Sequence, residues 1–228
     1  VPTMASLTPN WAHEGGSSLT LQVDGTNYNG TTIVRFNGSD RPTFFVNTTR
    51  VFALLSSADM GTPGDYPITV FNPSPGGGTG GPLTFTVNDL PSALMLSSAS
   101  VDENQAPGTA VGNLSTTDTW PSPESHTYSL VFGTGSTGNS SFAIVGNQLQ
   151  TAAGFNFEVQ SSFSIRVRST DFYGAWIEDV FTISVNDLNE TPTAVADAYT
   201  FNEGGAVNVS AALGVLDNPF TWPIPLSP

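Results

Sequence analysis

Apolar and polar residues alternate along most of this 228-residue chain. In the stretches 18–25 (SLTLQVDG) and 163–170 (FSIRVRST), every second side chain is apolar, so one face of each stretch can be buried. This period of two is typical of β-strands with one buried face. No stretch of ten or more residues has the spacing of an amphipathic helix. The same alternation recurs in PITVFN, LTFTVND, HTYSLVFG and VFTISVND.

The segments between these runs are rich in glycine, proline and asparagine, which are the residues that turns favour. Examples are DGTNYNG, FGTGSTGNSS and the glycine-rich NPSPGGGTGG. The last of these has no lysine followed by Ser or Thr, so it is interpreted as a hairpin loop and not as a phosphate-binding loop. Many short strands with regular turns predict an all-β fold of tandem immunoglobulin-like sandwiches.

A repeated phrase marks the domain boundaries. TVNDLPS at 86–92 and SVNDLNETP at 184–192 each close an alternating run and lead into a segment that contains proline. Such a phrase is typical of the last strand of a sandwich and its tether. The sequence therefore predicts one domain at 1–89, a second at 90–190, and an incomplete unit or connector tail at 191–228.

Composition narrows the functional classes. The net charge is −14, with 19 acidic residues against five basic ones, all of them arginine. Nucleic acids and anionic membranes are bound by basic patches, so neither is expected as a partner, whereas divalent cations are. There is no cysteine, which excludes disulfides and thiol chemistry. No run of 18 apolar residues could span a bilayer, and the start at Val1 suggests a processed chain or a piece of a longer one.

Two families share these patterns. Residues 1–89 resemble an IPT/TIG domain, an immunoglobulin-like sandwich, through SLTPNWAHEGGSSLTLQVDGTNY, IVRFNG and GDYPITVFNPSPGGGTGGPLTFTV. Residues 90–190 resemble a bacterial cadherin-like repeat through SVDENQAPGTAVGNLSTTD, FNFE, SIRVRSTDFYG and FTISVNDLNETP. Residues 194–218 resemble the opening of another such repeat.

The cadherin-like resemblance implies calcium at the ends of the second domain, because that family gathers six to eight oxygen ligands there. At the end that faces the third unit, DEN supplies Glu103, FNFE supplies a carboxylate and an amide, and the linker supplies three more groups. The implied ligands at this end are Glu103, Asn156, Glu158, Asp187, Asn189 and Glu190. A sparser set at the opposite end comprises Asp89, Asp118 and Asp171.

The chain departs from the family pattern at three positions. Trp120 replaces one carboxylate of the family's Asp-x-Asp, Asn156 replaces another aspartate, and Thr191 replaces the last asparagine of the linker. These departures favour one cation over three at the first end. The alternative to a cation is that the acidic and amide side chains cap strands and turns, which Asp and Asn do well.

Asparagine indicates a further modification. Seven Asn-x-Ser/Thr sequons occur, a modest excess over chance, and most fall in expected turns or on exposed strand positions. In a host that performs N-glycosylation, the acceptors would be Asn29, Asn37, Asn47, Asn113, Asn139, Asn189 and Asn208.

No catalytic constellation is evident. His13 and His126 fall in different domains, and neither lies in a metal-binding or nucleophile motif. We therefore expect a non-catalytic, extracellular or cell-surface module: a calcium-stiffened rod of a surface adhesin or fibre, a role that the resemblances imply. The alternative is an accessory or carbohydrate-binding region of a secreted glycosidase, with cell-surface glycans as partners.

The tail bears on assembly. The run 197–203 (DAYTFNE) and the run 206–211 (AVNVSA) alternate as though one face were covered, yet two strands cannot enclose a core. We expect neighbouring copies to complete them in a head-to-tail filament, or adjacent repeats of a longer chain to do so. A tail without fixed structure is the remaining alternative.

Overall fold

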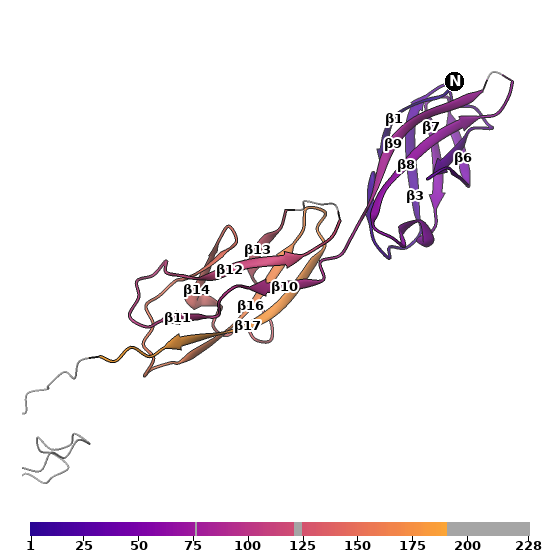
Figure 1. Ribbon diagram of the computed structural model, residues 1–228. Coiled ribbons are helices and arrows are strands. Elements are labelled where there is room, and N and C mark those ends of the chain that lie inside the picture. Colours follow the sequence, from indigo (N-terminus) through magenta and orange to yellow (C-terminus); the bar gives the residue numbers. More distant parts are fainter. Residues whose placement is uncertain (76, 121–124, 191–228) are drawn as a thin grey trace, which may run out of the picture. The chain divides into compact units, whose positions relative to one another are not determined.

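The computed structural model describes residues 1–75, 77–120 and 125–190. The chain divides into a unit Val1–Leu188, which holds two β-sandwiches, and a unit Asn189–Pro228 (Figure 1). The tandem β-sandwich fold agrees with the alternation in the sequence. Predictions about residues 191–228, including the sequon at Asn208, lie outside the described residues. Since Asn189 and Glu190 group with that second unit, the domain boundary at 190 stays a prediction.

The first sandwich packs a four-stranded sheet against a five-stranded one. A short 3₁₀ helix, η1 (Ser57–Met60), follows β7. In spatial order the strands are β1 (Thr3–Thr8), β3 (Leu19–Thr26), β7 (Arg50–Leu55) and β6 (Thr43–Asn47) in one sheet, and β2 (Trp11–His13), β9 (Gly78–Asn88), β8 (Gly64–Asn72), β4 (Ile33–Phe36) and β5 (Ser39–Arg41) in the other.

The core of this sandwich consists of the inward residues of the alternating strands. In β3, Leu21 and Val23 are buried, while the intervening Gln22 is only partly covered. The glycine-rich segment covers the turn between β8 and β9 and the first residues of β9, and the two strands form an antiparallel hairpin, as the sequence predicts. Alternation thus gives each strand one face for the core and one for solvent.

The second sandwich has two four-stranded sheets. A second short 3₁₀ helix, η2 (Asn139–Ser141), precedes β14. In spatial order the strands are β10 (Ala93–Leu96), β12 (Ala110–Thr117), β15 (Gln148–Thr151) and β14 (Phe142–Val145) in one sheet, and β11 (Ser100–Asp102), β17 (Trp176–Asn186), β16 (Ser162–Thr170) and β13 (Thr127–Leu130) in the other.

Strand β16 shows how the alternation is used. Ile165 and Val167 are fully buried, and Arg166 and Arg168, which alternate with them, point outward. Glu178 on β17 accepts hydrogen bonds from Arg166 Nε at 2.7 Å and from Arg168 Nε at 2.8 Å. Both arginines of this strand therefore pair with the same carboxylate.

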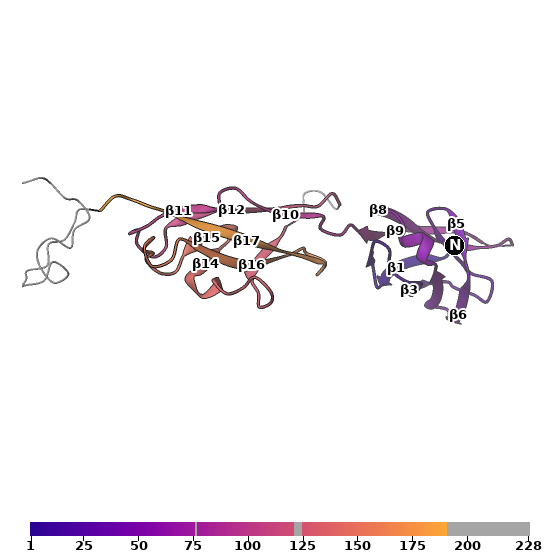
Figure 2. The same ribbon diagram turned by 90° about the horizontal axis from the view of Figure 1, so that it is seen from below.

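In both sandwiches an early strand pairs in parallel with the last strand. β2 lies beside the end of β9, and β11 lies beside the end of β17 (Figure 2). The other strand pairs of the described residues are antiparallel. The parallel pairs bring residues from the beginning and the end of each sandwich together, where the predicted ligands cluster.

In the described part of the chain, neither 3₁₀ helix has the length and apolarity needed to cross a membrane.

Candidate cation sites at the two ends of the second sandwich

Glu103 is the central residue at the end of the second sandwich from which the linker leaves. It follows β11, and its side chain is fully buried. Glu103 Oε2 accepts a hydrogen bond from the Phe157 backbone N–H at 2.9 Å, and Oε1 accepts one from the Leu188 N–H at 2.7 Å. The carboxylate thus ties β11 to the FNFE loop and to the residue that begins the tether.

The parallel pairing of β11 and β17 positions Glu103. Its backbone N–H donates to Asn186 O at 3.2 Å, which continues the β11–β17 ladder by one residue. Beside it, Asn186 Nδ2 donates to Asp102 Oδ1 at 2.8 Å. Sequence reasoning missed this pair, although Asp102 and Asn186 belong to the DEN and VND phrases that were singled out.

Glu158 lies beside Glu103. Each offers a carboxylate oxygen, and the two atoms lie within 4.8 Å of each other, while Glu158 is otherwise exposed. Glu190 belongs to the second unit, so its place as a further ligand stays a prediction. Asp187 and Asn189 are exposed after β17. These positions leave the linker oxygens accessible to a cation.

Asn156 has a structural role in the same loop. Its Oδ1 accepts a hydrogen bond from the Val159 N–H at 2.9 Å, which closes the turn that presents Glu158. An amide oxygen has two lone pairs, so one remains for a ligand. The alternative interpretation, in which amide side chains cap turns, therefore describes at least this residue.

The chemistry of this end suits a hard cation. Two carboxylates at this separation repel each other when both are ionised, and burial of one of them adds a desolvation cost. Each Glu103 oxygen accepts a hydrogen bond from a backbone N–H, which helps to hold the carboxylate in its charged form. Calcium binds carboxylate and amide oxygens in flexible geometry, and the residues present supply both.

At the opposite end, Asp89 is engaged by protein donors. It accepts hydrogen bonds from the Leu90 N–H at 2.8 Å and from the backbone N–H and hydroxyl of Thr119. Partial burial opposes its ionisation, but these hydrogen bonds outweigh that effect and hold the pKa of Asp89 below its ordinary value. Its backbone N–H also donates to Trp120 O at 3.1 Å. Asp89 therefore joins the two sandwiches directly.

Asp118 is nearly enclosed, with 1% of its side chain exposed. Its Oδ2 lies 3.2 Å from His126 Nε2, and its Oδ1 has no hydrogen-bond partner among the described residues. Burial raises the pKa of Asp118; His126 opposes the shift, and the charges of Asp89 and Asp171 add to it. His126 therefore contacts one carboxylate of the predicted set directly.

Asp171 contacts the first sandwich. Asn88, the last residue of β9, donates through Nδ2 to Asp171 Oδ2 at 2.8 Å, and the Ala175 N–H donates to Oδ1 at 2.8 Å. Nearby, Trp11 and Tyr173 pack edge to face with ring centroids 5.1 Å apart. Asp171 thus helps to dock one sandwich against the other.

The structure brings Asp89, Asp118 and Asp171 to the same junction. In the ranges that the structure describes, their oxygens do not form a group lying within 4.8 Å of one another. A cation at this end stays a prediction. Asn88 and His126 are both visible in the sequence, but no local pattern there shows that Asn88 contacts Asp171 or that His126 contacts Asp118.

Comparisons with known proteins concern the fold alone. No protein-family model matches this chain, and no curated protein matches it. Among solved structures, it is similar to chicken VE-cadherin EC1-2, with 18% identity over 78% of this chain and 97% of that chain and a TM-score of 0.38. A protocadherin gammaB7 EC3-6 cis-dimer structure gives 16% identity, 82% and 49% coverage and a TM-score of 0.37. This chain spans about half the length of that protocadherin fragment.

The sequons differ in what their asparagines contact. Asn29 and Asn47 are exposed, and each accepts hydrogen bonds through Oδ1 from the backbone N–H and hydroxyl of the threonine two residues later. Asn139, by contrast, donates to Val131 O at 2.9 Å and accepts from the Arg166 N–H at 2.9 Å. Asn37, Asn113 and Asn189 are exposed. Glycosylation stays a prediction at all of these positions.

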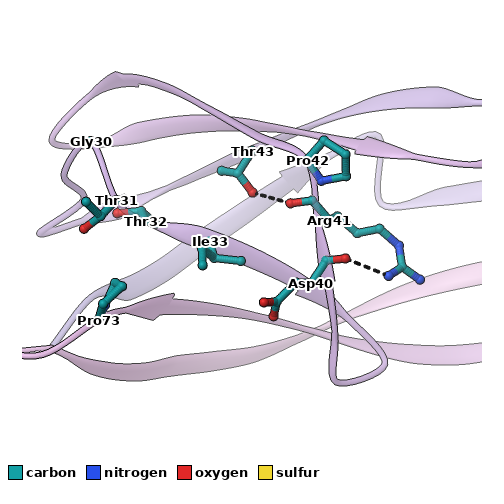
Figure 3. A pocket seen from close by; sticks show the side chains of 9 residues that line it. All are labelled: Gly30, Thr31, Thr32, Ile33, Asp40, Arg41, Pro42, Thr43 and Pro73. Carbon is teal, nitrogen blue, oxygen red and sulfur yellow. Dashed lines mark hydrogen bonds between the residues drawn. The ribbon is translucent and has the colours of Figure 1, made fainter.

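A hollow lies on the first sandwich, beside β4 and β5 (Figure 3). Threonine and proline side chains line most of it, together with Asp40 and Arg41. Asp40 accepts a hydrogen bond from Arg35 Nε at 2.7 Å, and Arg41 pairs with Asp59. The two charged side chains of this hollow are therefore each paired with a residue outside its lining, Asp40 with Arg35 of β4 and Arg41 with Asp59 of η1.

Proposed function

We propose that this chain is a non-catalytic extracellular structural or adhesive module, whose linker after the second sandwich is stiffened by calcium. The observation that carries the proposal is the buried carboxylate of Glu103, which holds the Leu188 N–H where the tether begins. The IPT/TIG-like and cadherin-like sequence patterns support placing it in a surface adhesin or a head-to-tail fibre.

In this proposal, calcium binds to Glu103 and Glu158 and takes further oxygens from Asp187, Asn189 and Glu190. The ion relieves the repulsion between the carboxylates and ties the tether to the FNFE loop. The ion would thereby add ligand bonds to the hydrogen bond through which Glu103 already holds the Leu188 N–H. Extracellular modules bind calcium at about 10⁻⁴–10⁻³ M, so the module would be saturated in many external fluids.

A calcium titration tests the proposal. We expect the melting temperature of the second sandwich to rise with calcium through that range, corresponding to about 2.7 kcal/mol of added stability at a hundredfold excess over Kd. Glu158→Gln and Asp187→Asn should each reduce this rise while leaving the melting temperature in chelator nearly unchanged. Calorimetric titration should give the same dependence on calcium.

Asp179→Asn is the matched control. Asp179 is an exposed aspartate on β17 of the same sandwich, and its Oδ1 accepts only the adjacent Val180 N–H at 2.7 Å among the hydrogen bonds of its side chain. This variant makes the same charge change as Asp187→Asn and should keep the full response to calcium. Identical melting curves in calcium and in chelator for the wild type would refute the calcium proposal.

The second candidate is an accessory or carbohydrate-binding region of a secreted glycosidase. Exposed aromatic rings favour it, since Trp176 is 55% exposed and Phe172 is 76% exposed. Arg168 covers one face of Trp176 at 4.4 Å, which leaves the other face for a sugar ring. Affinity electrophoresis in polysaccharide gels, with Trp176→Ala as the comparison, separates this candidate from the first.

A further inference from the structure

The first sandwich has an uncovered sheet edge. β6 is the last strand of its sheet and pairs with β7 alone, and it lies at the margin of the domain (Figure 1). One side of its backbone has no strand beside it among the described residues. Such an edge can pair with a strand of another chain.

The side chains of this edge are large and apolar. Phe44 is 60% exposed, Phe45 is 43% exposed and Val46 is 49% exposed. Phe44 lies opposite Phe52 of β7, on the face of the sheet that points away from the core, and Leu54 extends the same face. A contiguous exposed apolar surface of this kind marks a protein–protein contact more often than chance exposure does.

The usual protection of a sheet edge is missing here. Exposed edges are blunted by charged side chains, by proline within the strand or by covering segments. β5, the edge of the other sheet, carries Asp40 and Arg41, whereas β6 carries no charge from Thr43 to Asn47. One β-bulge near Phe45 is the only such device in the strand.

The distribution of acidic residues allows a second copy of the chain to be the partner of this edge. The protein carries a net charge of −14, so two copies repel each other over most of their surfaces. The stretch 42–58, which contains β6 and β7, has no acidic residue, and Arg50, its one charged residue, pairs with Asp24 at 2.7 Å. A second copy can therefore approach this edge without placing carboxylate against carboxylate.

We propose that β6 pairs antiparallel with β6 of a second copy, so that two four-stranded sheets join into one. The contact is isologous, because each copy presents the same strand. With Phe45 opposite its own counterpart, Phe44 faces the partner's Val46, so apolar side chains meet at the three central positions of the strand, and Thr43 faces the partner's Asn47 at its ends. This side-to-side contact does not depend on the calcium proposal or on the head-to-tail contact expected of the tail.

Sedimentation of the full chain, made in a host that does not glycosylate Asn47, tests the proposal. We expect a monomer–dimer equilibrium that strengthens with salt, because salt screens the repulsion between the copies. Phe44→Lys should weaken dimerisation at least tenfold. The matched control is Val145→Lys, since Val145 is 59% exposed and ends β14, which is also an edge strand; this variant should dimerise like the wild type.

A cross-linking experiment tests the pairing itself. The chain has no cysteine, so Phe45→Cys introduces a single thiol at the proposed two-fold axis. Directly opposed strand positions bring Cβ atoms to about 4.5–5.5 Å, near disulfide range. Mild oxidation should join this variant into dimers faster than Val145→Cys. A monomer at every concentration, equal dimerisation of Phe44→Lys and wild type, or equal cross-linking of the two cysteine variants would each overturn the proposal.

Discussion

Replacing Glu103 should destabilise the second sandwich even without calcium. Glu103→Ala removes the acceptor of two backbone N–H groups and leaves a small cavity where the side chain was buried. Leu188 is exposed, so its N–H can donate to water instead. Phe157 is partly buried, so its N–H is left without an acceptor and accounts for more of the loss in stability. An unsatisfied buried donor costs about 1–3 kcal/mol, and loss of the buried methylenes adds about 1 kcal/mol. We expect a loss of about 2–4 kcal/mol.

Glu103→Gln should fall between the wild type and Glu103→Ala. Its carbonyl oxygen still accepts one of the two N–H groups, but its amide NH₂ is brought against the other donor. Glu158→Ala is the control, because Glu158 is exposed, and a surface change of this kind stays within about 0.5 kcal/mol. Urea unfolding in chelator measures the stability, and amide exchange at Phe157 and Leu188 reports the local loss.

The result that would refute this reasoning is a Glu103→Ala protein within about 0.5 kcal/mol of the wild type in chelator. The buried carboxylate would then contribute nothing to the second sandwich on its own. A loss of amide protection spread equally over the first sandwich would also contradict it, since Glu103 contacts none of that domain through the hydrogen bonds described above.

Two predictions concern the first sandwich. Burial opposes ionisation of Asp59, but the hydrogen bonds from Arg41 and Ser56 outweigh burial and lower the pKa of Asp59. The ionised carboxylate therefore stabilises the fold at pH values above the pKa that Asp59 has in the unfolded chain. This stabilisation is lost as the pH falls through the pKa that Asp59 has in the folded protein. Asp59→Asn should therefore flatten the acid limb of the stability profile, and a limb as steep as that of the wild type would contradict this. Burial raises the pKa of Tyr28 to about 12, and its hydroxyl has no hydrogen-bond partner among the described residues. Tyr28→Phe should leave stability unchanged or raise it by up to about 1 kcal/mol in urea unfolding, and a clear loss would mean that the hydroxyl is bonded.

Much of the fold was predictable because it depends on local pattern. The alternation around Leu21 and around Ile165 shows which face each strand buries, and the strands β9 and β17 end within the two VNDL phrases. The site was predictable only where family resemblance supplied the spacing. Glu103 was named as a ligand, but nothing local shows that its side chain accepts the Leu188 N–H, because that contact joins residues 85 positions apart.

The junction between the sandwiches was less accessible to sequence reasoning for the same reason. Asn88 and Asp171 are 83 positions apart, and their hydrogen bond depends on the docking of two finished domains. The apolar edge of β6 illustrates another limit. Alternation predicts that a strand has a buried face, but it does not predict whether the strand is central or at an edge. Phe44 and Val46 would give the same sequence pattern in either position. Only the sheet order shows that β6 is an edge.

The parallel pairing of an early strand with the last strand has a mechanical consequence. In the second sandwich, Ser100–Asp102 run alongside Ser184–Asn186 in the same direction, and Trp11–His13 run alongside Thr86–Asn88 in the first. When tension pulls the two ends of such a domain apart, these strands slide past each other lengthwise, so their ladder hydrogen bonds are loaded together. A hairpin pulled open at its free ends breaks its bonds one at a time. Both sandwiches are therefore connected in the orientation that resists stretching, and their lifetime under load is set by the rate of unfolding.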